Sequence, residues 1–276
     1  MAASWLKMKT LKEIGVFLLG RFPFLNAGLL MMVLAERANM DKNIPPFNVD
    51  FLYGYIICMT LLGVGMSYDI ARKYCTIAYI GQLFYMAYSL YTNEKLGYSL
   101  WLVNRLISRV IGLAGVYIIY AFLTSKKKSR QLQKIGEGCL AVFTATSMYI
   151  LVNSEEDRQL FEAKIPFKAI PLFFLITVMG ACAMIYINGG IFLTDASQAM
   201  MCINFALVLC LYCDLKYWVD KRGVPFWVQV KLITDDIAIC IGLFVMAFAR
   251  IYWKHRQPKE DQHGNLYRHE AREHED

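Results

Sequence analysis

The sequence predicts an all-α integral membrane protein with about eight transmembrane helices, arranged as two parallel four-helix repeats. Three observations carry this prediction. Of the 276 residues, 57% are hydrophobic and 18% are charged, whereas soluble domains average about 45–50% and about 25%. The apolar residues gather in blocks about as long as a bilayer-spanning helix, roughly 20 residues. Two of these blocks, 100–124 and 226–252, align with each other without gaps.

Each predicted span is an apolar block bounded by polar segments. The first, 12–35, contains Arg21 and Pro23, and we expect a kink there because proline removes a backbone hydrogen bond. The last span is amphipathic at its start, where ionisable residues lie between 231 and 236. In chain order, the eight spans are 12–35, 50–68, 74–92, 100–124, 135–153, 169–188, 192–214 and 226–252.

The lysine and arginine counts on the two sides of the membrane predict the orientation. Arg21 and Arg109 lie deep in predicted spans and are left out of the count. Of the others, 16 fall on the side that holds both termini and 11 on the opposite side. Because basic residues concentrate on the cytoplasmic side of membrane proteins, both termini are predicted to be cytosolic. This places the protein in a membrane as a multi-pass protein, without indicating the organelle.

An internal repeat is visible at an offset of 126 residues, where a Trp-x-x-x-basic start recurs. Trp101 aligns with Trp227, and Arg105 aligns with Lys231. Four helices per repeat is an even number, so both halves enter the membrane in the same sense, as parallel repeats about an axis along the membrane normal. The predicted units are a first repeat over 1–130, a second repeat over 131–253, and a disordered polar tail over 254–276 that is poor in apolar residues.

Ionisable residues inside the spans are the candidate functional residues, because burying charge in a membrane is costly and such residues usually face the bundle interior. Positions 109 and 235 are equivalent in the repeat and carry opposite charges, so an Arg109–Asp235 pair across the interface is expected. The functional interpretation is a polar cavity for a ligand or ion, and the alternative is a structural pair or interfacial snorkelling. The predicted intramembrane polar cluster comprises Arg21, Arg109, Glu137, Asp195, Asp235 and Asp236.

The sequence carries no sign of an enzyme. All four histidines lie after the last span, so the commonest general base and metal ligand is missing from the membrane core. The motifs of serine hydrolases, P-loop nucleotidases, zinc proteases and dinucleotide-binding folds are absent. We therefore expect a protein that is not an enzyme, with no catalytic residue, no metal and no cofactor.

The net charge of +7 does not indicate a nucleic-acid partner, because the basic residues lie between apolar blocks, where they report topology. The expected partners are the lipid bilayer and proteins that the sequence does not identify. The densest basic segment lies between the fourth and fifth spans. It either determines topology or contacts anionic lipid, and its basic residues are Lys126, Lys127, Lys128 and Arg130.

Motifs spread over roughly 15–250 resemble the transmembrane protein 101 family. They occur in colinear order and include L-L-G-R-F-P-F at 18–24, A-E-R-A at 35–38, S-R-Q-L-Q at 129–133 and Tyr217-Trp218. The resemblance implies a multi-pass membrane protein associated with activation of nuclear factor kappa B signalling, and it supplies no catalytic residue. More remotely, the repeated helix pattern is similar to surfeit-locus cargo receptors and DoxX-like four-helix proteins, a likeness of fold that does not fix function.

Two functions follow as expectations. The first is a non-enzymatic multi-pass membrane protein that works through protein partners and is linked, by the family resemblance, to nuclear factor kappa B signalling. The alternative is a cargo receptor, or a transporter of a small molecule or ion, with a polar cavity between the repeats. The first function depends on the loops and the tail. The second depends on Arg21, Arg109, Asp195 and Asp235.

Overall fold

The computed structural model describes most of the backbone, and every regular element in the described part is helical. Side chains are described from Thr10 to Ala249 within the same ranges, apart from Arg37, Asn39 and Ala169. The described ranges are 2–39, 49–68, 71–92, 99–125, 129–165, 169–190 and 192–273.

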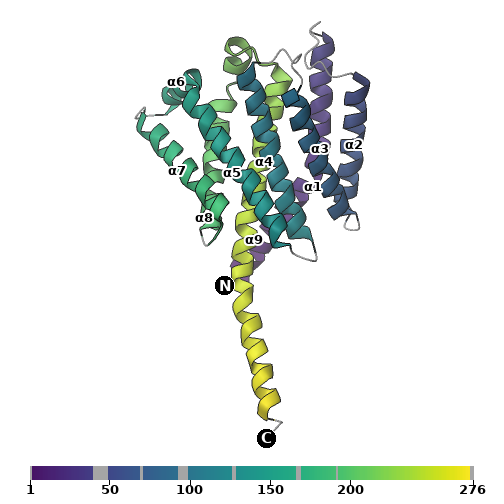
Figure 1. Cartoon of the computed structure of the whole chain (residues 1–276), viewed down its shortest axis with the longest axis vertical. Coiled ribbons are helices and arrows are strands. Elements are labelled where there is room, and N and C mark those ends of the chain that lie inside the picture. The colour runs from purple at the N-terminus through teal and green to yellow at the C-terminus, as the bar shows by residue number, and fades with distance from the viewer. Residues whose placement is uncertain are drawn as a thin grey trace.

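Eight long helices and one short one form the described fold, with two π-helical turns near the end of the bundle opposite the termini. Figure 1 shows the long helices side by side, with the start of α1 and the far end of α9 on the same side of the bundle. The elements are α1 (Ala2–Asn39), α2 (Val49–Ser67), α3 (Arg72–Thr92), α4 (Leu100–Thr124), α5 (Arg130–Asn153), α6 (Glu155–Lys164), α7 (Ala169–Asn188), α8 (Leu193–Leu207), η2 (Val208–Tyr212), η3 (Tyr217–Lys221) and α9 (Phe226–Glu273).

Seven of the described helices are long and apolar enough to cross a membrane, which confirms the all-α multi-pass fold. Helix α3, the third predicted span, is absent from the seven because its tyrosines, threonines and Gln82 lower its mean hydropathy. It nevertheless packs between α2 and α4, and the number eight stays a prediction. The seven are Thr10–Glu36, Val49–Ser67, Leu100–Thr124, Arg130–Asn153, Ile170–Asn188, Leu193–Tyr212 and Phe226–Ala249.

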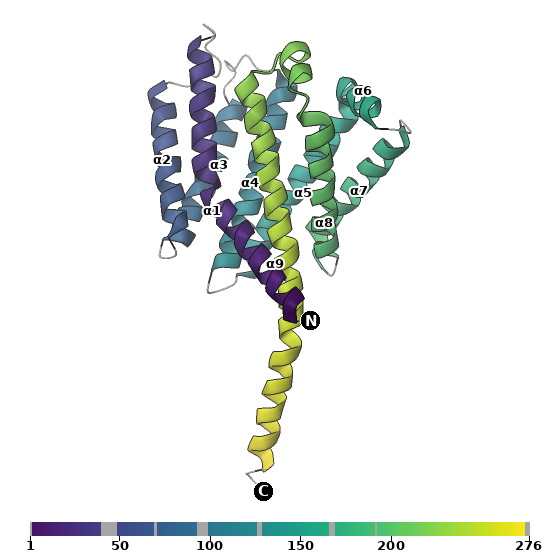
Figure 2. The same cartoon turned by 180° about the vertical axis from the view of Figure 1, so that it is seen from behind.

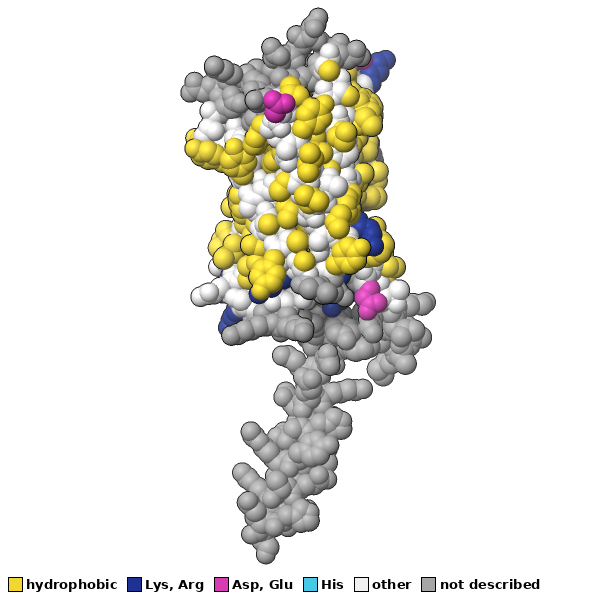
Figure 3. Space-filling model, turned by 90° about the vertical axis from the view of Figure 1, so that its right-hand side faces the viewer, with side chains coloured by type: hydrophobic (Ala, Val, Ile, Leu, Met, Phe, Trp, Pro, Cys, Tyr) yellow, Lys and Arg dark blue, Asp and Glu magenta, His cyan; other side chains and the backbone are white. Residues whose placement is uncertain are grey.

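The outer surface of the bundle is largely apolar. Figure 3 shows hydrophobic side chains along most of the height of one face, with most of the visible charged side chains nearer its two ends. Large side chains stand well exposed on several helices, among them Leu61 at 65% and Phe173 at 74%. A soluble monomer rarely exposes a continuous apolar surface of this kind, so the predicted bilayer environment is supported.

Helix α1 runs without interruption through Pro23. Figure 2 shows that α1 changes direction partway along its length. Proline inside a helix lacks the backbone N–H that would bond to the preceding turn, and it bends the helix for that reason. The predicted kink agrees with this course. Past the bend, Glu36 lies in the last turn of α1, and its carboxylate accepts hydrogen bonds from the backbone N–H groups of Phe226 at 2.9 Å and Trp227 at 3.0 Å. This contact caps the N-terminus of α9 and fixes the end of α1 to the start of α9.

The helix neighbours follow the same scheme in the two halves of the chain. In the first half α1 packs on α2, α2 on α3 and α3 on α4, while in the second half α5 packs on α7, α7 on α8 and α8 on α9. Between the halves, α4 packs on α9, α4 packs on α5, and α1 packs on α9. If α1 to α4 correspond to α5, α7, α8 and α9, each contact has an equivalent. The repeat boundaries 1–130 and 131–253 stay a prediction.

Helices α4 and α9 lie at the centre of the bundle. Small residues let their backbones approach closely, as is common between membrane helices. A Cβ atom on Gly112 of α4 would lie 2.8 Å from Phe143 of α5 and 2.9 Å from Ile239 of α9. A Cβ atom on Gly242 of α9 would lie even closer, 2.3 Å from Val116 of α4. This close packing fixes the rotation of both helices, and so it determines which residues at their starts face each other.

Helix α9 continues beyond the bundle to Glu273, and Figure 1 shows this part projecting away from the other helices. A helix without tertiary packing is marginal in water unless its sequence is strongly helix-forming. Disorder of the polar tail over 254–276 in solution stays a prediction.

Candidate functional site

A group of buried ionisable side chains, here called the polar centre, lies where the first half of α4 packs on the first half of α9. It consists of Arg105 and Arg109 from α4 and Lys231, Asp235 and Asp236 from α9. Both arginines and both aspartates are at most 4% exposed. In each helix, residues four apart share one face, and this spacing brings Arg105 above Arg109 and Lys231 above Asp235.

The start of α4 is set locally by Ser99, whose hydroxyl oxygen accepts a hydrogen bond from the backbone N–H of Leu102 at 3.3 Å. A serine in this position satisfies one of the free N–H groups of the first helical turn. At about 1.5 Å per residue, Arg105 lies roughly 8 Å from the start of the helix at Leu100. The polar centre is therefore nearer the end of the bundle at which α4 and α9 begin, which is opposite the end that holds the termini.

Arg109 and Asp236 form the ion pair that joins the two helices. Nε and Nη2 of Arg109 lie 2.9 Å and 2.8 Å from Oδ2 of Asp236. Nη1 of Arg109 also donates to the backbone carbonyl of Arg105 at 3.2 Å. In a membrane interior such a pair removes much of the cost of burying either charge alone.

The predicted pair between Arg109 and Asp235 is wrong. Asp235 instead accepts a hydrogen bond from Lys231, one turn earlier in the same helix, at 2.6 Å. Adjacent residues of a helix point about 100° apart, so Asp236 faces α4 while Asp235 faces its own neighbour. The repeat alignment predicted the correct pair of helices and missed the facing residue by one position.

Arg105 has no acidic partner within ion-pair distance among the described side chains. Its side chain is 1% exposed, and its Nη1 and Nη2 atoms have no hydrogen-bond partner. The guanidinium carbon lies 3.9 Å from the ring centre of Trp218, 4.3 Å from that of Tyr212 and 5.1 Å from that of Trp101. Cation–π attraction stabilises the charge from its faces, but the rings provide no acceptor for the N–H groups at its edge.

The two tryptophans stack on each other, with ring centres 5.6 Å apart and planes inclined by 13°. Arg222 contacts both rings, with its guanidinium carbon 4.4 Å from the centre of Trp101 and 6.0 Å from that of Trp218. Arg105 also contacts both rings, so two cations lie against one pair of tryptophans. Trp218 is completely buried and is positioned by the hydrogen bond from its Nε1 to the carbonyl of Leu211 at 2.8 Å.

Arg222 fastens the stack to α6. Its Nη2 lies 2.7 Å from Oγ of Ser154 and 3.0 Å from Oδ1 of Asp157, and its Nη1 contacts Glu156. Nearby, outside the membrane-spanning segments, Lys164 donates to Asp214 at 2.8 Å, and this bond lowers the pKa of the Asp214 carboxyl. These contacts hold the π-helical segment 208–221 over the polar centre. π-helical turns are rare and occur frequently at functional sites.

A small cavity borders the unpaired guanidinium. Its volume is about 10 Å³, room for about one water molecule. Its polar lining is formed by Arg105 and Arg109 of α4, Ser147 of α5, Asp157 of α6 and Tyr212 of η2.

The charges around this cavity nearly cancel. Three acid–base pairs neutralise one another, namely Arg109 with Asp236, Lys231 with Asp235, and Arg222 with Asp157. Arg105 has no salt-bridge partner, and the balancing negative charge belongs to Glu156, which shares Arg222 with Asp157 and is 63% exposed. The arrangement suits a small anionic group that accepts hydrogen bonds from Nη1 and Nη2. Among the described residues, no three His, Cys, Asp or Glu side chains lie close enough together to hold a metal ion.

The six residues of the predicted polar cluster do not lie together. Arg109, Asp235 and Asp236 meet in the polar centre, whereas the other three lie elsewhere. Arg21 is exposed on α1 and lies over the ring of Phe17, 3.5 Å from its centre. Asp195 is exposed in the first turn of α8, where a carboxylate favours the helix N-terminus. Both residues fall inside apolar runs of the sequence, and an apolar run does not indicate which face of a helix is buried.

Glu137, the sixth residue, is buried on α5 and is 4% exposed. It accepts a hydrogen bond from Nε2 of Gln133 at 2.6 Å. It lies toward the end of the bundle that holds the termini, and it lines a different cavity together with residues of α4 and α9.

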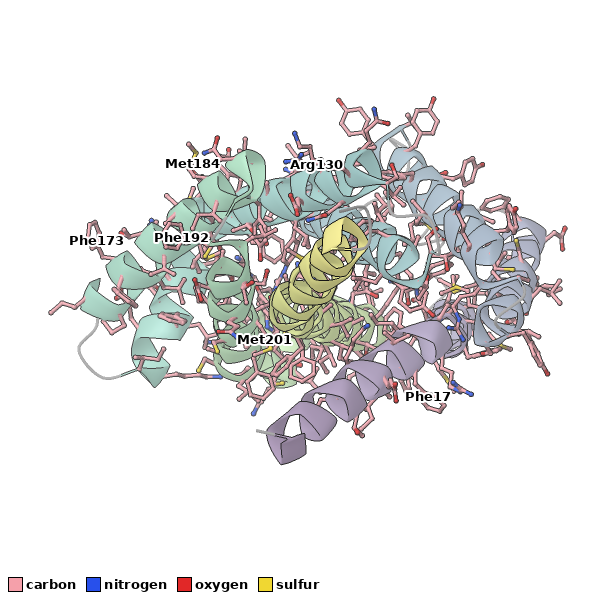
Figure 4. The ribbon with its side chains drawn as sticks, turned by 90° about the horizontal axis from the view of Figure 1, so that it is seen from below. Phe17, Arg130, Phe173, Met184, Phe192 and Met201 are labelled. Carbon is pink, nitrogen blue, oxygen red and sulfur yellow. The ribbon has the colours of Figure 1, made fainter. Side chains whose placement is uncertain are left out.

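The predicted lipid contact falls mostly outside the described residues, since Lys126, Lys127 and Lys128 are not among them. Arg130 is described and exposed at the start of α5. Figure 4, seen from the end that holds the termini, shows Arg130 pointing away from the bundle, as do Phe17 and Phe173 at other points of the rim. Contact of this segment with anionic lipid stays a prediction.

Several important residues of the site were not in the predicted cluster. They are Arg105, Trp101, Tyr212, Trp218 and Arg222. The sequence did hold one signal, because Trp101 and Arg105 form the Trp-x-x-x-basic start that recurs in α9. The rest could not be found, because their grouping needs α4, α6 and the π-helical segment to meet in space.

Residues 5–249 match the model of the TMEM101 protein family, and this range contains the whole polar centre. No solved structure matches the chain.

Proposed function

The chain belongs to the TMEM101 protein family, and we propose that it works without catalysis, as a membrane receptor or transporter that binds a small anionic group at Arg105. This is the alternative function that the sequence allowed, with the ligand site moved from a general cavity between repeats to one side of α4. The multi-pass helical architecture supplies the membrane setting. The unpaired guanidinium of Arg105 supplies the positive charge and the free hydrogen-bond donors that would bind the anion.

The observation that carries the proposal is the buried, unpaired charge of Arg105. Removing an ion from water costs several kcal/mol in real proteins unless a partner compensates it. Arg105 has three aromatic faces beside it but no acceptor for Nη1 or Nη2. An anion in the bordering cavity provides both the opposite charge and the missing hydrogen bonds. Arginine is well suited to this task, since its fork of N–H groups matches a carboxylate or binds a spherical anion.

The dimensions of the cavity restrict the ligand. With room for about one water molecule, the cavity accepts a halide ion or the end of a carboxylate. Asp157 on the opposite wall is paired with Arg222, which it shares with the largely exposed Glu156. The selectivity expected from this geometry is for small monovalent anionic groups over large or doubly charged ones.

The position of the site indicates the side from which the ligand comes. Arg105 lies toward the end of the bundle at which α4 and α9 begin, opposite the two termini. If the termini are cytosolic, as the basic-residue distribution predicts, the ligand enters from the extracellular or luminal side. The link to nuclear factor kappa B signalling rests on the family resemblance alone. In this proposal, signalling partners contact the loops and the tail while the ligand binds near the opposite end.

Tryptophan fluorescence tests the proposal, because Trp218 and Trp101 contact the guanidinium of Arg105, at 3.9 Å and 5.1 Å, which would bind the anion. Full-length protein in detergent is titrated with iodide, a halide that quenches indole emission, at constant ionic strength. Saturable quenching is expected, and chloride and acetate are expected to compete with it. Arg105→Gln is expected to leave only the linear quenching of freely diffusing iodide.

Arg130→Gln is the matched control, because it removes an exposed arginine outside the site. It is expected to quench like the unmodified protein. Arg105→Lys keeps the charge and shows whether a loss in Arg105→Gln follows from charge or from misfolding. Linear quenching in the unmodified protein, or equal saturable quenching in Arg105→Gln, would overturn the proposal.

A further inference from the structure

A second cavity lies at the opposite end of α4 and α5, and we infer that it binds a small organic cation, an ammonium group carried on a compact apolar body. Its volume is about 150 Å³. Glu137 and Gln133 of α5 supply its polar lining, while the rest of the wall is apolar and comes from α4 and α9. This site goes beyond the proposed anion binding and does not depend on it.

Glu137 supplies the negative charge. Its side chain is 4% exposed, and the hydrogen bond that reaches it comes from the neutral amide of Gln133 at 2.6 Å. Among the described side chains it has no basic partner within ion-pair distance. An ionised carboxylate in so dry a place is costly without a cation nearby. Gln133, one turn earlier, fixes the orientation of the carboxylate without neutralising it.

The walls of the cavity favour an apolar ligand body. Ile119 and Leu123 of α4 and Met246 of α9 line it on the sides away from Glu137. A cavity of about 150 Å³ lined by aliphatic side chains is large enough for a benzene-sized molecule. A single carboxylate among such side chains therefore complements an amine whose body is one ring or a short branched chain.

This cavity is separate from the Arg105 site. Ile119 follows Arg105 by 14 residues, about 21 Å along α4. The cavity lies toward the end of the bundle that holds the termini, and the Arg105 site lies toward the opposite end. The two sites also have opposite charge, so a ligand of one is excluded from the other by its sign.

The test compares two probes of similar shape, benzylamine and benzyl alcohol, by calorimetric titration of the full-length protein in detergent. Benzylamine carries a positive charge at neutral pH, and benzyl alcohol is neutral. Benzylamine is expected to bind saturably, at least about tenfold more tightly than benzyl alcohol, because each tenfold step requires only about 1.4 kcal/mol. Equal affinity for the two probes, or no saturable benzylamine binding, would overturn the inference.

Three variants locate the site. Glu137→Gln preserves the size of the side chain and a hydrogen bond to Gln133, and it is expected to abolish the preference for the amine. Leu123→Phe leaves the carboxylate in place but fills the cavity, and it is expected to weaken both probes. Glu155→Gln, at an exposed position of α6, is the matched control and is expected to bind like the unmodified protein. A Glu137→Gln variant that still prefers benzylamine contradicts the inference.

Arg105→Gln keeps this inference distinguishable from the proposed function. It is expected to lose iodide binding and retain benzylamine binding, since the two sites lie at opposite ends of α4. Loss of benzylamine binding in a folded Arg105→Gln protein would contradict the independence of the cavity.

Discussion

Arg109 of α4 directs two N–H groups, at 2.9 Å and 2.8 Å, onto a single oxygen of Asp236 in α9. The pair is almost completely buried, with the two side chains 4% and 1% exposed. It joins the last helix of the first predicted repeat to the last helix of the second. The other oxygen of Asp236 has no hydrogen-bond partner, so the hydrogen bonds that this carboxylate accepts come from Arg109.

Removing one member of this pair is expected to destabilise the bundle strongly. Asp236→Asn leaves Arg109 buried without a counter-charge, and breaking a buried pair in this way costs about 3–5 kcal/mol. The double variant Arg109→Met with Asp236→Leu is expected to recover most of the loss, because neither charge is then left unpaired. Thermal unfolding in detergent measures both. An Asp236→Asn protein as stable as the unmodified one contradicts the assignment.

A double-mutant cycle separates Asp236 from its neighbour. Arg109→Ala combined with Asp236→Ala is expected to give a large coupling energy, because the side chains are in contact. The same cycle with Asp235→Ala is expected to give a much smaller one, because Asp235 bonds to Lys231. The free energy of unfolding of the single and double variants supplies the comparison. A larger coupling through Asp235 would restore the pair predicted from the repeat.

The rotation of each helix about its axis is what the sequence does not determine. Apolar length and hydropathy are local properties, so the spans and the all-α fold could be predicted from the residues. In α1 the apolar residues surround the helix, so the sequence does not indicate which face is buried. In the structure Arg21 lies on the exposed face. In α9 a difference of one position, Asp235 or Asp236, decides which carboxylate faces α4. That choice follows from the close contact of Gly112 and Gly242 with the neighbouring helices.

The π-helical turns are a second feature beyond sequence-based prediction. The segment 208–221 continues the apolar pattern of α8 for its first turn, and the predicted span 192–214 therefore includes only its first half. The wider turns carry Tyr212 and Trp218 onto the two sides of Arg105. No residue type in this segment signals a π-helix by itself, and the arrangement depends on contacts with α4 and α6.

Trp218 is expected to be essential for the stability of the site. It is fully buried, stacks on Trp101 and covers one face of Arg105. Replacing a buried tryptophan by alanine costs about 3–5 kcal/mol, whereas Trp218→Phe keeps an aromatic face and is expected to cost less. Thermal unfolding of the two variants checks the order. Equal stability of Trp218→Ala and Trp218→Phe would show that the stack contributes little.

The close approach of α4 to its neighbours predicts a large effect of a single methyl group. At Gly112 a Cβ atom would meet Phe143 and Ile239 at under 3 Å, and overpacking of this kind costs about 1–3 kcal/mol. Gly28→Ala on α1 is the matched control, since nothing lies within 4 Å of the added atom. It is expected to be neutral or slightly stabilising. A harmless Gly112→Ala would contradict the described packing.

The pair of Lys164 and Asp214 predicts a small effect of acid. The pKa of Asp214 is lowered by the bond from Lys164, so its carboxylate stabilises the fold above the ordinary aspartate pKa of about 3.9. This contribution is lost as the pH falls through the lower pKa of the folded protein. Both side chains are about one-third exposed, so the effect is modest. Asp214→Asn is expected to unfold with a shallower dependence on pH below about 4. An identical acid dependence contradicts the pairing.

The most direct measurement for the central claim is an experimental structure of the full-length protein prepared in bromide, with the anomalous signal of bromine locating the ion. The account predicts one ordered bromide against Nη1 and Nη2 of Arg105, in the cavity lined by Ser147 and Tyr212, and its absence in Arg105→Gln. A structure in which Arg105 turns to bond with Asp236 or Asp157, with no bromide beside it, would contradict the account.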